Sequence, residues 1–407
     1  MRANPLLIQI AYFVCVSFLG LWVLEALEGS SSEISKLDML FTSVSASTVS
    51  SMSTVEMQSL SNPQLIVLTV LMLVGGEVFT SMLGLFLIRF KLKVDPCDEL
   101  EMGNNNPDLR YTSIKYLGLV VLGYQLVVQG IGVAMLSLYL CLVSSAKEVL
   151  SNKGLHLLTF SVFTVVSTFA SCGFVPTNEN MVVFAKHSPL LIILIPQVLL
   201  GNTLFPPCLR FLIWGLGKFG ILNKIRDHEE IAGYNYKHLL PRRHSRFLVG
   251  TVFGFILIQV VLFCCVDWNS EAWKGMNLNS YHKLVAVTFQ SVNSRHTGET
   301  IVDISLLSPS ILMLFVVMIE REEMKEDPLN FSVFNIVIEV ISAYGNVGFT
   351  TGYSCKRRIK VEGNCEDKWI GFVGRWSKEG KIILMLVMLF GRLKKFNMDG
   401  GKAWLLL

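Results

Sequence analysis

The sequence predicts an all-α polytopic membrane protein from its composition, its long apolar runs and a short segment that recurs four times. Of its 407 residues, 52% are hydrophobic and only 16% are charged, and the mean hydropathy is +0.53. Soluble domains usually carry about 25% charged residues, so this chain lacks the polar groups to cover a water-facing surface. The net charge of +4 is too small to indicate a nucleic-acid partner, and we expect none.

The apolar runs are long enough to cross a bilayer as helices, which takes about 20 residues. The first run follows only Arg2 and has no small-residue cleavage site, so it is predicted as a span and not a removed signal peptide. The predicted spans are 5–27, 64–92, 113–143, 188–217 and 245–267, with weaker candidates at 304–319 and 371–396.

Basic residues follow alternate spans, which predicts the orientation. Loops rich in Lys and Arg stay in the cytoplasm, so these tails and the N-terminus are predicted to be cytoplasmic. The tails contain Arg89, Lys91 and Lys93; Lys218, Lys224, Arg226, Lys237, Arg242, Arg243 and Arg246; and Arg392, Lys394 and Lys395.

Four shorter segments of moderate hydrophobicity stand between the spans, at 37–53, 156–173, 282–298 and 331–348. They are too polar to cross the membrane and too apolar for ordinary loops. Half-spanning helices that return through a loop fit this profile.

These short segments align with one another as an internal repeat. They read FTSVSASTVSSMS (41–53), FTVVSTFASCGFV (163–175), FQSVNSRHTGET (289–300) and IEVISAYGNVGFT (338–350). One column of the alignment holds Ser51, Gly173, Gly298 and Gly348, and the third copy is one residue shorter.

Glycine in that column has a specific physical use. A pore that strips water from a monovalent cation points successive backbone carbonyls inward, and glycine takes the required φ > 0 conformations without Cβ strain. The competing interpretation is that small residues merely let helices pack closely. One glycine would favour close packing, but four copies in register, each after a short helix, favour a ring of carbonyls.

Several motifs together strongly resemble the plant HKT-type cation transporters of the Trk/Ktr/HKT superfamily. They are VSSMSTVEM, STFASCGFVPTNENM, NSRHTGE, ISAYGNVGFTTGYSC and the C-terminal FGRLKKFNM. The resemblance implies four membrane–pore–membrane repeats around a pseudo-fourfold pore, with Ser51, Gly173, Gly298 and Gly348 as the selectivity filter. It also implies a protein of the plasma membrane's lipid bilayer that transports sodium or potassium without a cofactor. Members of the family resemble dimers, so the resemblance allows a homodimer.

Serine in the first filter column resembles the sodium-selective, class I pattern of that family. From the residues alone, we expect Ser51 to lose the left-handed backbone conformation and to add a Cβ and a hydroxyl to the ring. The predicted function is passive, sodium-selective transport. The alternatives are sodium–potassium symport, and a non-conducting truncated form that binds and modulates an intact paralogue. No enzyme motif is present, and no cysteine–histidine cluster indicates a metal site.

Charged residues within the apolar part are further candidates. Glu77, inside the second span, either lines the cation pathway or bonds to a neighbouring helix. Arg295 stands three residues before Gly298 and could brace that loop by donating to carbonyls. The family resemblance implies that a basic residue of the final helix acts as a barrier to ions; the candidates are Arg375, Lys378 and Lys381.

Two cysteines share one polar loop that the orientation places outside the cell. Cys355 and Cys365 stand at the ends of CKRRIKVEGNC. The extracellular side is oxidising, so the loop permits a disulfide between them.

The spacing of the four columns predicts an internal deletion. The first three columns are 122 and 125 residues apart, but the fourth follows after only 50. The apolar core left at this boundary, Ile311 to Ile319, has nine residues. Nine residues make about 14 Å of helix, under half of a core about 30 Å thick. The predicted repeats are A (1–93), B (94–226), C (227–319, second helix truncated) and D (320–407, first helix missing).

The deletion leaves the predicted pore incompletely walled between repeats C and D. The leading interpretation is a truncated form or natural variant of a working transporter, with reduced transport. Two others stay open: residues 304–319 are re-entrant and the pore conducts, or a partner chain supplies the missing wall. The partner would be a second copy in a homodimer or a paralogue in a heteromer.

Overall fold

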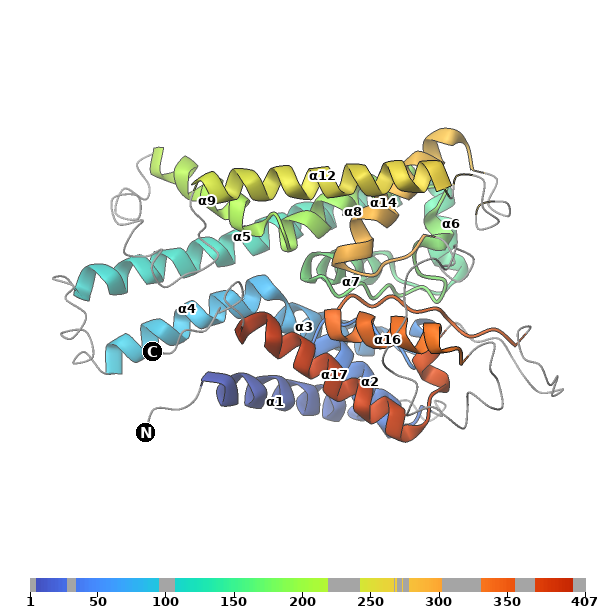
Figure 1. Cartoon of the computed structure of the whole chain (residues 1–407), viewed down its shortest axis with the longest axis horizontal. Coiled ribbons are helices and arrows are strands. Elements are labelled where there is room, and N and C mark those ends of the chain that lie inside the picture. The colour runs from blue at the N-terminus through green and yellow to red at the C-terminus, as the bar shows by residue number, and fades with distance from the viewer. Residues whose placement is uncertain are drawn as a thin grey trace.

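A computed structural model describes residues 5–27, 34–94, 107–218, 242–266, 268, 273, 278–301, 331–355 and 370–397. Over these ranges the regular structure is helical and contains no β-strand, which confirms the all-α prediction. The long helices run roughly along the long axis of the molecule (Figure 1). Three helices are long and apolar enough to cross a membrane, and three bent helix pairs raise the number of candidate spans to six.

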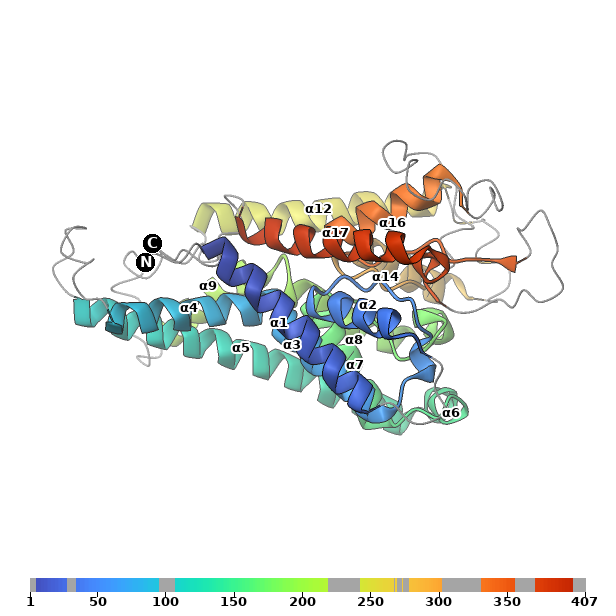
Figure 2. The same ribbon diagram turned by 90° about the horizontal axis from the view of Figure 1, so that it is seen from below.

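The residues predicted as repeat A form two outer helices, one of them bent, and one short inner helix. The outer elements are α1 (Pro5–Ala26) and the pair α3 (Asn62–Gly75) and α4 (Glu77–Val94); the inner one is α2 (Lys36–Ser47), and η1 (Met57–Ser59) follows its loop. Figure 2 shows α1 crossing over α3 with α2 beside them. The span predicted as one helix over 64–92 bends by 57° at Gly76, where α3 ends and α4 begins.

Repeat B has the same plan with one added helix. Its elements are α5 (Pro107–Leu142), α6 (Ser144–Asn152), α7 (Leu157–Ala170), η3 (Asn180–Phe184), α8 (Ser188–Gly201) and α9 (Phe205–Lys218). The predicted span over 188–217 is also broken, because α8 and α9 meet at 82°.

Repeats C and D contribute fewer helices to the described structure. They are α12 (Arg242–Val266), α14 (Ser280–His296), α16 (Val333–Gly345), η6 (Phe372–Arg375) and α17 (Lys378–Asn397). The predicted segment 304–319 lies outside the described residues. All four segments predicted as half-spanning helices are helical, as α2, α7, α14 and α16.

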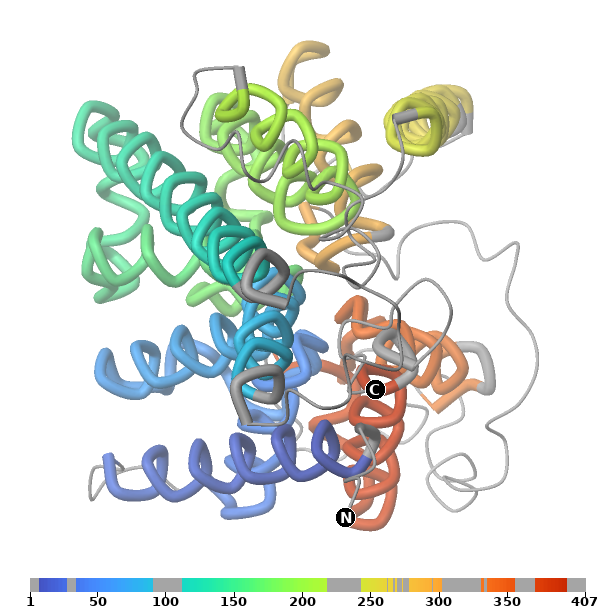
Figure 3. The backbone as a smooth tube through the Cα atoms, turned by 90° about the vertical axis from the view of Figure 1, so that its left-hand side faces the viewer, coloured from blue at the N-terminus to red at the C-terminus, as the bar shows by residue number. Residues whose placement is uncertain are grey.

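The short inner helices pack in a cyclic order. Three of them contact the second outer helix of the preceding repeat: α7 packs on α3, α14 on α8, and α2 on α17. Figure 3, a view along the long axis of the molecule, shows the helices grouped around a centre, with α12 on the outside. The fourth inner helix, α16, packs on α17 of its own repeat.

Candidate functional site

The four predicted filter columns share one unusual backbone conformation. The φ angles are 55° at Ser51, 86° at Gly173, 74° at Gly298 and 89° at Gly348. Each residue stands just after the C-terminal end of an inner helix, α2, α7, α14 or α16. The sequence alignment therefore coincides with a repeated backbone geometry.

The prediction that serine loses the left-handed conformation is wrong, because Ser51 adopts it. Hydrogen bonds on both sides hold this backbone: Ser50 N donates to Ser45 O at 2.8 Å, and Met52 N donates to Ser45 Oγ at 2.8 Å. A non-glycine residue at positive φ costs roughly 1–2 kcal/mol, and the surrounding contacts must offset this strain. What distinguishes Ser51 from the glycines is its side chain.

The four columns lie next to one another in chain order and close into a ring. A Cβ on Gly173 would overlap the carbonyl of Thr297 and stand 3.3 Å from Ser51 Oγ. A Cβ on Gly298 would overlap the carbonyl oxygen of Val347 and stand 2.8 Å from the carbonyl carbon of Gly348. A Cβ on Gly348 would overlap Ser51 itself. The ring has no room for a side chain at any glycine column.

The inner helices end in the same way at this ring. In three repeats a backbone N–H bonds the carbonyl five residues earlier, from Ser50 to Ser45, from Cys172 to Ser167 and from Val347 to Ser342. In repeat C the bond starts one residue later in the alignment, from Gly298 N to Asn293 O at 3.1 Å, as expected from the shorter copy. Four helix C-termini thus face one centre, and their partial negative charges favour a cation there.

A second set of glycines supports the ring from outside. A Cβ on Gly75 would overlap Ser47 O, one on Gly201 would overlap Phe169 O, and one on Gly391 would overlap Tyr344 O. The three carbonyls occupy one column of the alignment, four residues before the filter column. The glycines come at unequal distances after the filter, so spacing in the sequence does not reveal them.

Arg392 is a residue of this region that the sequence analysis assigned to a cytoplasmic tail. It directly follows Gly391, is 1% exposed, and donates a hydrogen bond to Gly75 O. Its guanidinium lies 6.0 Å from the Phe13 ring. Glu77 is half-buried at the start of α4, directly after the bend at Gly76.

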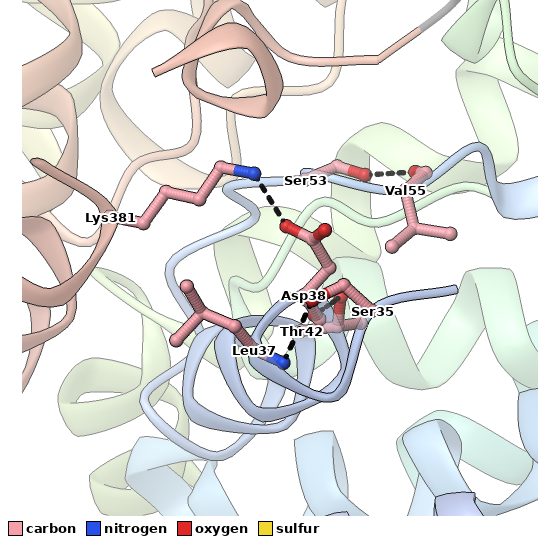
Figure 4. Close-up of polar contacts among 7 residues, drawn as sticks. All are labelled: Ser35, Leu37, Asp38, Thr42, Ser53, Val55 and Lys381. Atoms are coloured by element: carbon pink, nitrogen blue, oxygen red, sulfur yellow. Dashed lines mark hydrogen bonds and ion pairs between the residues drawn. The ribbon is translucent and has the colours of Figure 1, made fainter. Parts of the chain in front are cut away.

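The other basic candidates lie elsewhere. Lys381 Nζ pairs with Asp38 Oδ1 at 2.7 Å, which ties α17 to the start of α2 (Figure 4). Arg375 stacks over the Tyr353 ring at 5.0 Å, and Lys378 is exposed at the first turn of α17. The side chain of Arg295 lies outside the described part of the structure.

Polar contacts join the repeats unevenly. Between B and C, Thr168 Oγ1 donates to Glu299 Oε1 at 2.6 Å, and Thr203 bonds His296 at 3.0 Å. Between A and B, Gln58 N donates to the side chain of Asn178 at 2.9 Å. Two contacts join D and A: the Lys381–Asp38 ion pair and a hydrogen bond from Asn346 to Ser50.

The C–D boundary differs in burial. Val44, Val166 and Ile341 occupy one column of the inner helices, seven residues before the filter. Val44 and Val166 are 4% and 6% exposed, whereas Ile341 is 50% exposed. On the other side of this boundary, 0% of the most apolar stretch of α12 is buried, against 28% for α1 and 33% for α5. Within the described residues, the wall is thinnest at this boundary.

Two remaining predictions concern cysteines and metals. Cys355 is disulfide-bonded, while its predicted partner, Cys365, lies outside the described residues. Among the residues that the structure describes, no group of three or more His, Cys, Asp or Glu side chains could hold a metal ion.

Known proteins resemble this chain over most of its length. The family model TrkH, described as a cation transport protein, matches residues 3–320. The chain is 42% identical to cation transporter HKT1;3 of Oryza sativa subsp. japonica over 98% of this chain and 91% of that protein. It is 44% identical to sodium transporter HKT1 of Arabidopsis thaliana, over 91% of this chain and 88% of that protein. The crystal structure of the potassium transporter TrkH from Vibrio parahaemolyticus shares the fold, with a TM-score of 0.52 at 15% identity. The superposition covers 96% of this chain and 83% of that one.

Proposed function

The chain belongs to the TrkH family of cation transport proteins, and from that premise we propose that it carries sodium ions passively across the plasma membrane. The ring of Ser51, Gly173, Gly298 and Gly348 acts as its selectivity filter, and the N-terminus lies in the cytoplasm. A membrane potential of about 100 mV supplies roughly 2.3 kcal/mol per ion, so no cofactor is needed.

The observation that carries this proposal is the shared positive φ at the four columns, each directly after an inner helix. The four loops abut one another, and the Ser51 side chain lies where a Cβ on Gly348 would point. Backbone carbonyls can replace the hydration shell of a monovalent cation. The four converging helix C-termini add a field that attracts cations and repels anions.

Selectivity for sodium rests on the side chain of Ser51. Since Ser51 keeps the same left-handed backbone as the glycines, the difference is steric: its Cβ and hydroxyl fill the space that a Cβ on Gly348 would need. A narrower ring disfavours the larger potassium ion, although ligand field strength also contributes in such filters. The sodium transporter of Arabidopsis thaliana, at 44% identity, supports this choice over sodium–potassium symport.

The test is Ser51→Gly in a transport-deficient cell under defined sodium and potassium gradients. Glycine tolerates the φ of 55° and removes the side chain, so potassium permeability should rise. Unchanged reversal potentials would overturn the assignment of selectivity to Ser51.

Among the basic residues of the last helix, Arg392 suits the role of barrier to ions. It is buried one residue beyond the glycine that supports the ring, whereas Lys381 is held by Asp38. A fixed positive charge beneath a cation filter raises the energy of an ion that passes it.

A second candidate function follows from the open C–D boundary: a non-conducting form that modulates an intact paralogue. The exposed Ile341 and the unburied α12 support it. The alignment with the rice transporter spans 489 residues, 82 more than this chain contains, so the relative carries segments that are absent here. The TrkH match also ends at residue 320, at the predicted junction.

Sodium uptake separates the two functions. The unaltered chain is compared with a version whose C–D boundary is restored from a full-length relative, at equal surface expression. Robust flux from the unaltered chain rules out the non-conducting form. Absent flux, restored by the insertion and accompanied by co-purification with a full-length paralogue, supports it; self-association alone would indicate a homodimer.

A further inference from the structure

Ser51 needs support from its surroundings, because a serine at positive φ is strained. Part of that support lies within repeat A, where Ser45 binds the N–H groups of Ser50 and Met52. A further contact comes from the other end of the chain. Asn346, at the end of α16, donates from Nδ2 to Ser50 Oγ at 2.6 Å.

Asn346 joins three elements at one buried point. Its Nδ2 also donates to Met388 O of α17 at 3.1 Å and approaches Ala343 O of α16 at 3.4 Å. The side chain is 1% exposed. Asn346 has a φ of 51° and ends α16 as a left-handed cap, a conformation that asparagine tolerates better than most residues.

The orientation of this amide is determined by its neighbours. Two of them, Met388 O and Ala343 O, are carbonyl oxygens that only accept hydrogen bonds, so the NH2 group and not the oxygen must face them. The same NH2 group reaches Ser50. The direction of the bond from repeat D to repeat A is therefore fixed.

The hydrogen bond from Asn346 to Ser50 is the first of a series of hydrogen bonds that leads into α2. Thr48 Oγ1 donates to Val44 O at 2.7 Å, which leaves Ser50 to donate its hydroxyl to Thr48 Oγ1 at 2.8 Å. Three hydrogen bonds thus run in one direction, from Asn346 through Ser50 and Thr48 to the backbone of the inner helix. Successive bonds of this kind strengthen one another in a buried environment.

Asn346 differs from its counterparts in the other repeats. In the same column stand Val49, which has no polar side chain, and Ser171, which accepts from Asn202 of its own repeat at 3.0 Å. Of these three left-handed residues, Asn346 alone donates to the filter loop of another repeat among the described contacts.

We propose that Asn346 is a specificity-determining positioning residue, which holds Ser51 against Gly348 through its hydrogen bond to Ser50. It touches no ion, but it sets the width of the ring where repeats D and A meet. This inference rests on the proposed sodium-selective transport.

Two variants remove the bond from opposite sides. Asn346→Gly keeps a residue that accepts the left-handed conformation and deletes the amide, while Ser50→Ala deletes the acceptor. Each should lower the sodium-to-potassium permeability ratio by roughly fivefold, because losing such a bond costs about 1 kcal/mol and 1.4 kcal/mol corresponds to tenfold. The double variant should fall no further than either single variant.

The matched control is Asn152→Gly, the same substitution at the exposed end of α6. It should leave the reversal potential unchanged. A merely structural role for Asn346 would reduce the number of molecules at the surface and the current, but not the permeability ratio. Currents with an unaltered ratio in Asn346→Gly and Ser50→Ala, or additive effects in the double variant, would overturn the proposal.

A readout without conduction separates this proposal from the proposed function. If the unaltered chain carries no current, the transport function fails, and the melting temperature of the purified protein in sodium or potassium chloride decides about Asn346. Greater stabilisation by sodium that both single variants abolish supports the positioning role. A sodium preference that survives in the variants, or is absent from the unaltered chain, refutes it.

Discussion

The ring and the C–D boundary are built from the same repeat, yet they differ in what surrounds them. At the ring, all four loops contact their neighbours so closely that a single Cβ on any of the glycines would overlap backbone or side-chain atoms. At the C–D boundary, Ile341 is half exposed where Val44 and Val166 are buried. Within the described residues, the four loops therefore contact one another although the outer wall at the C–D boundary is less buried.

The largest effect is expected at the ring itself. Gly173→Ala places a Cβ on Thr297 O at a φ of 86°, so the loop must move, and a substitution of this kind costs several kcal/mol. Sodium uptake should be lost at normal surface expression. The control is Gly254→Ala on α12, where a Cβ would meet nothing within 4 Å. Equal uptake in the two variants would break the distinction between ring and wall.

A smaller effect is expected at the closed D–A boundary. Lys381→Met breaks the ion pair with Asp38. The side chains of Lys381 and Asp38 are only 11% and 20% exposed, so the free energy of unfolding should fall by about 1–3 kcal/mol. Exchange of the two charges, Asp38→Lys with Lys381→Asp, should recover part of the thermal stability. If the exchanged pair is no more stable than Lys381→Met, this boundary is not held by the ion pair.

The smallest effects are expected for side chains of the inner helices at the outer wall, where Val166 is buried and Ile341 is exposed. Val166→Ala removes a buried side chain and should lower the free energy of unfolding by about 1–2 kcal/mol, because packing contacts are lost. Ile341→Ala, at 50% exposure, should lower it by less than about 1 kcal/mol. Thermal unfolding in detergent measures both. A larger loss at Ile341 would mean that this face is covered in the purified protein.

The sequence predicted much of the fold because the relevant signals are local. Low charge and long apolar runs indicate a membrane protein, and all four inner helices were found from their hydrophobicity and length. The breaks at Gly76 and between α8 and α9 were missed, since both spans read as continuous apolar runs. The four columns with positive φ were found because the same motif recurs, and their role as a filter stays a prediction. Ser51 is the one column whose backbone was predicted wrongly.

The remaining site residues act through contacts that local patterns cannot show. Arg392 reads as part of a basic tail, but it is buried. Gly391 brings α17 against Tyr344, and Gly75 O accepts a hydrogen bond from the Arg392 guanidinium. Lys381 reads as a pore cation, but Asp38 lies within 2.7 Å of it. No periodicity in either helix signals these partners.

The sequence by itself determined the all-helical membrane class and the four columns that share a positive φ, because these depend on composition and on motifs a few residues long. Only the tertiary structure decided which residues hold the ring closed. The contacts of Ser50 with Asn346, of Gly75 with Arg392 and of Asp38 with Lys381 join residues 296, 317 and 343 positions apart. Such pairs form only when the last repeat folds back onto the first, so their chemistry is set by the closure of the ring and not by neighbours in the chain.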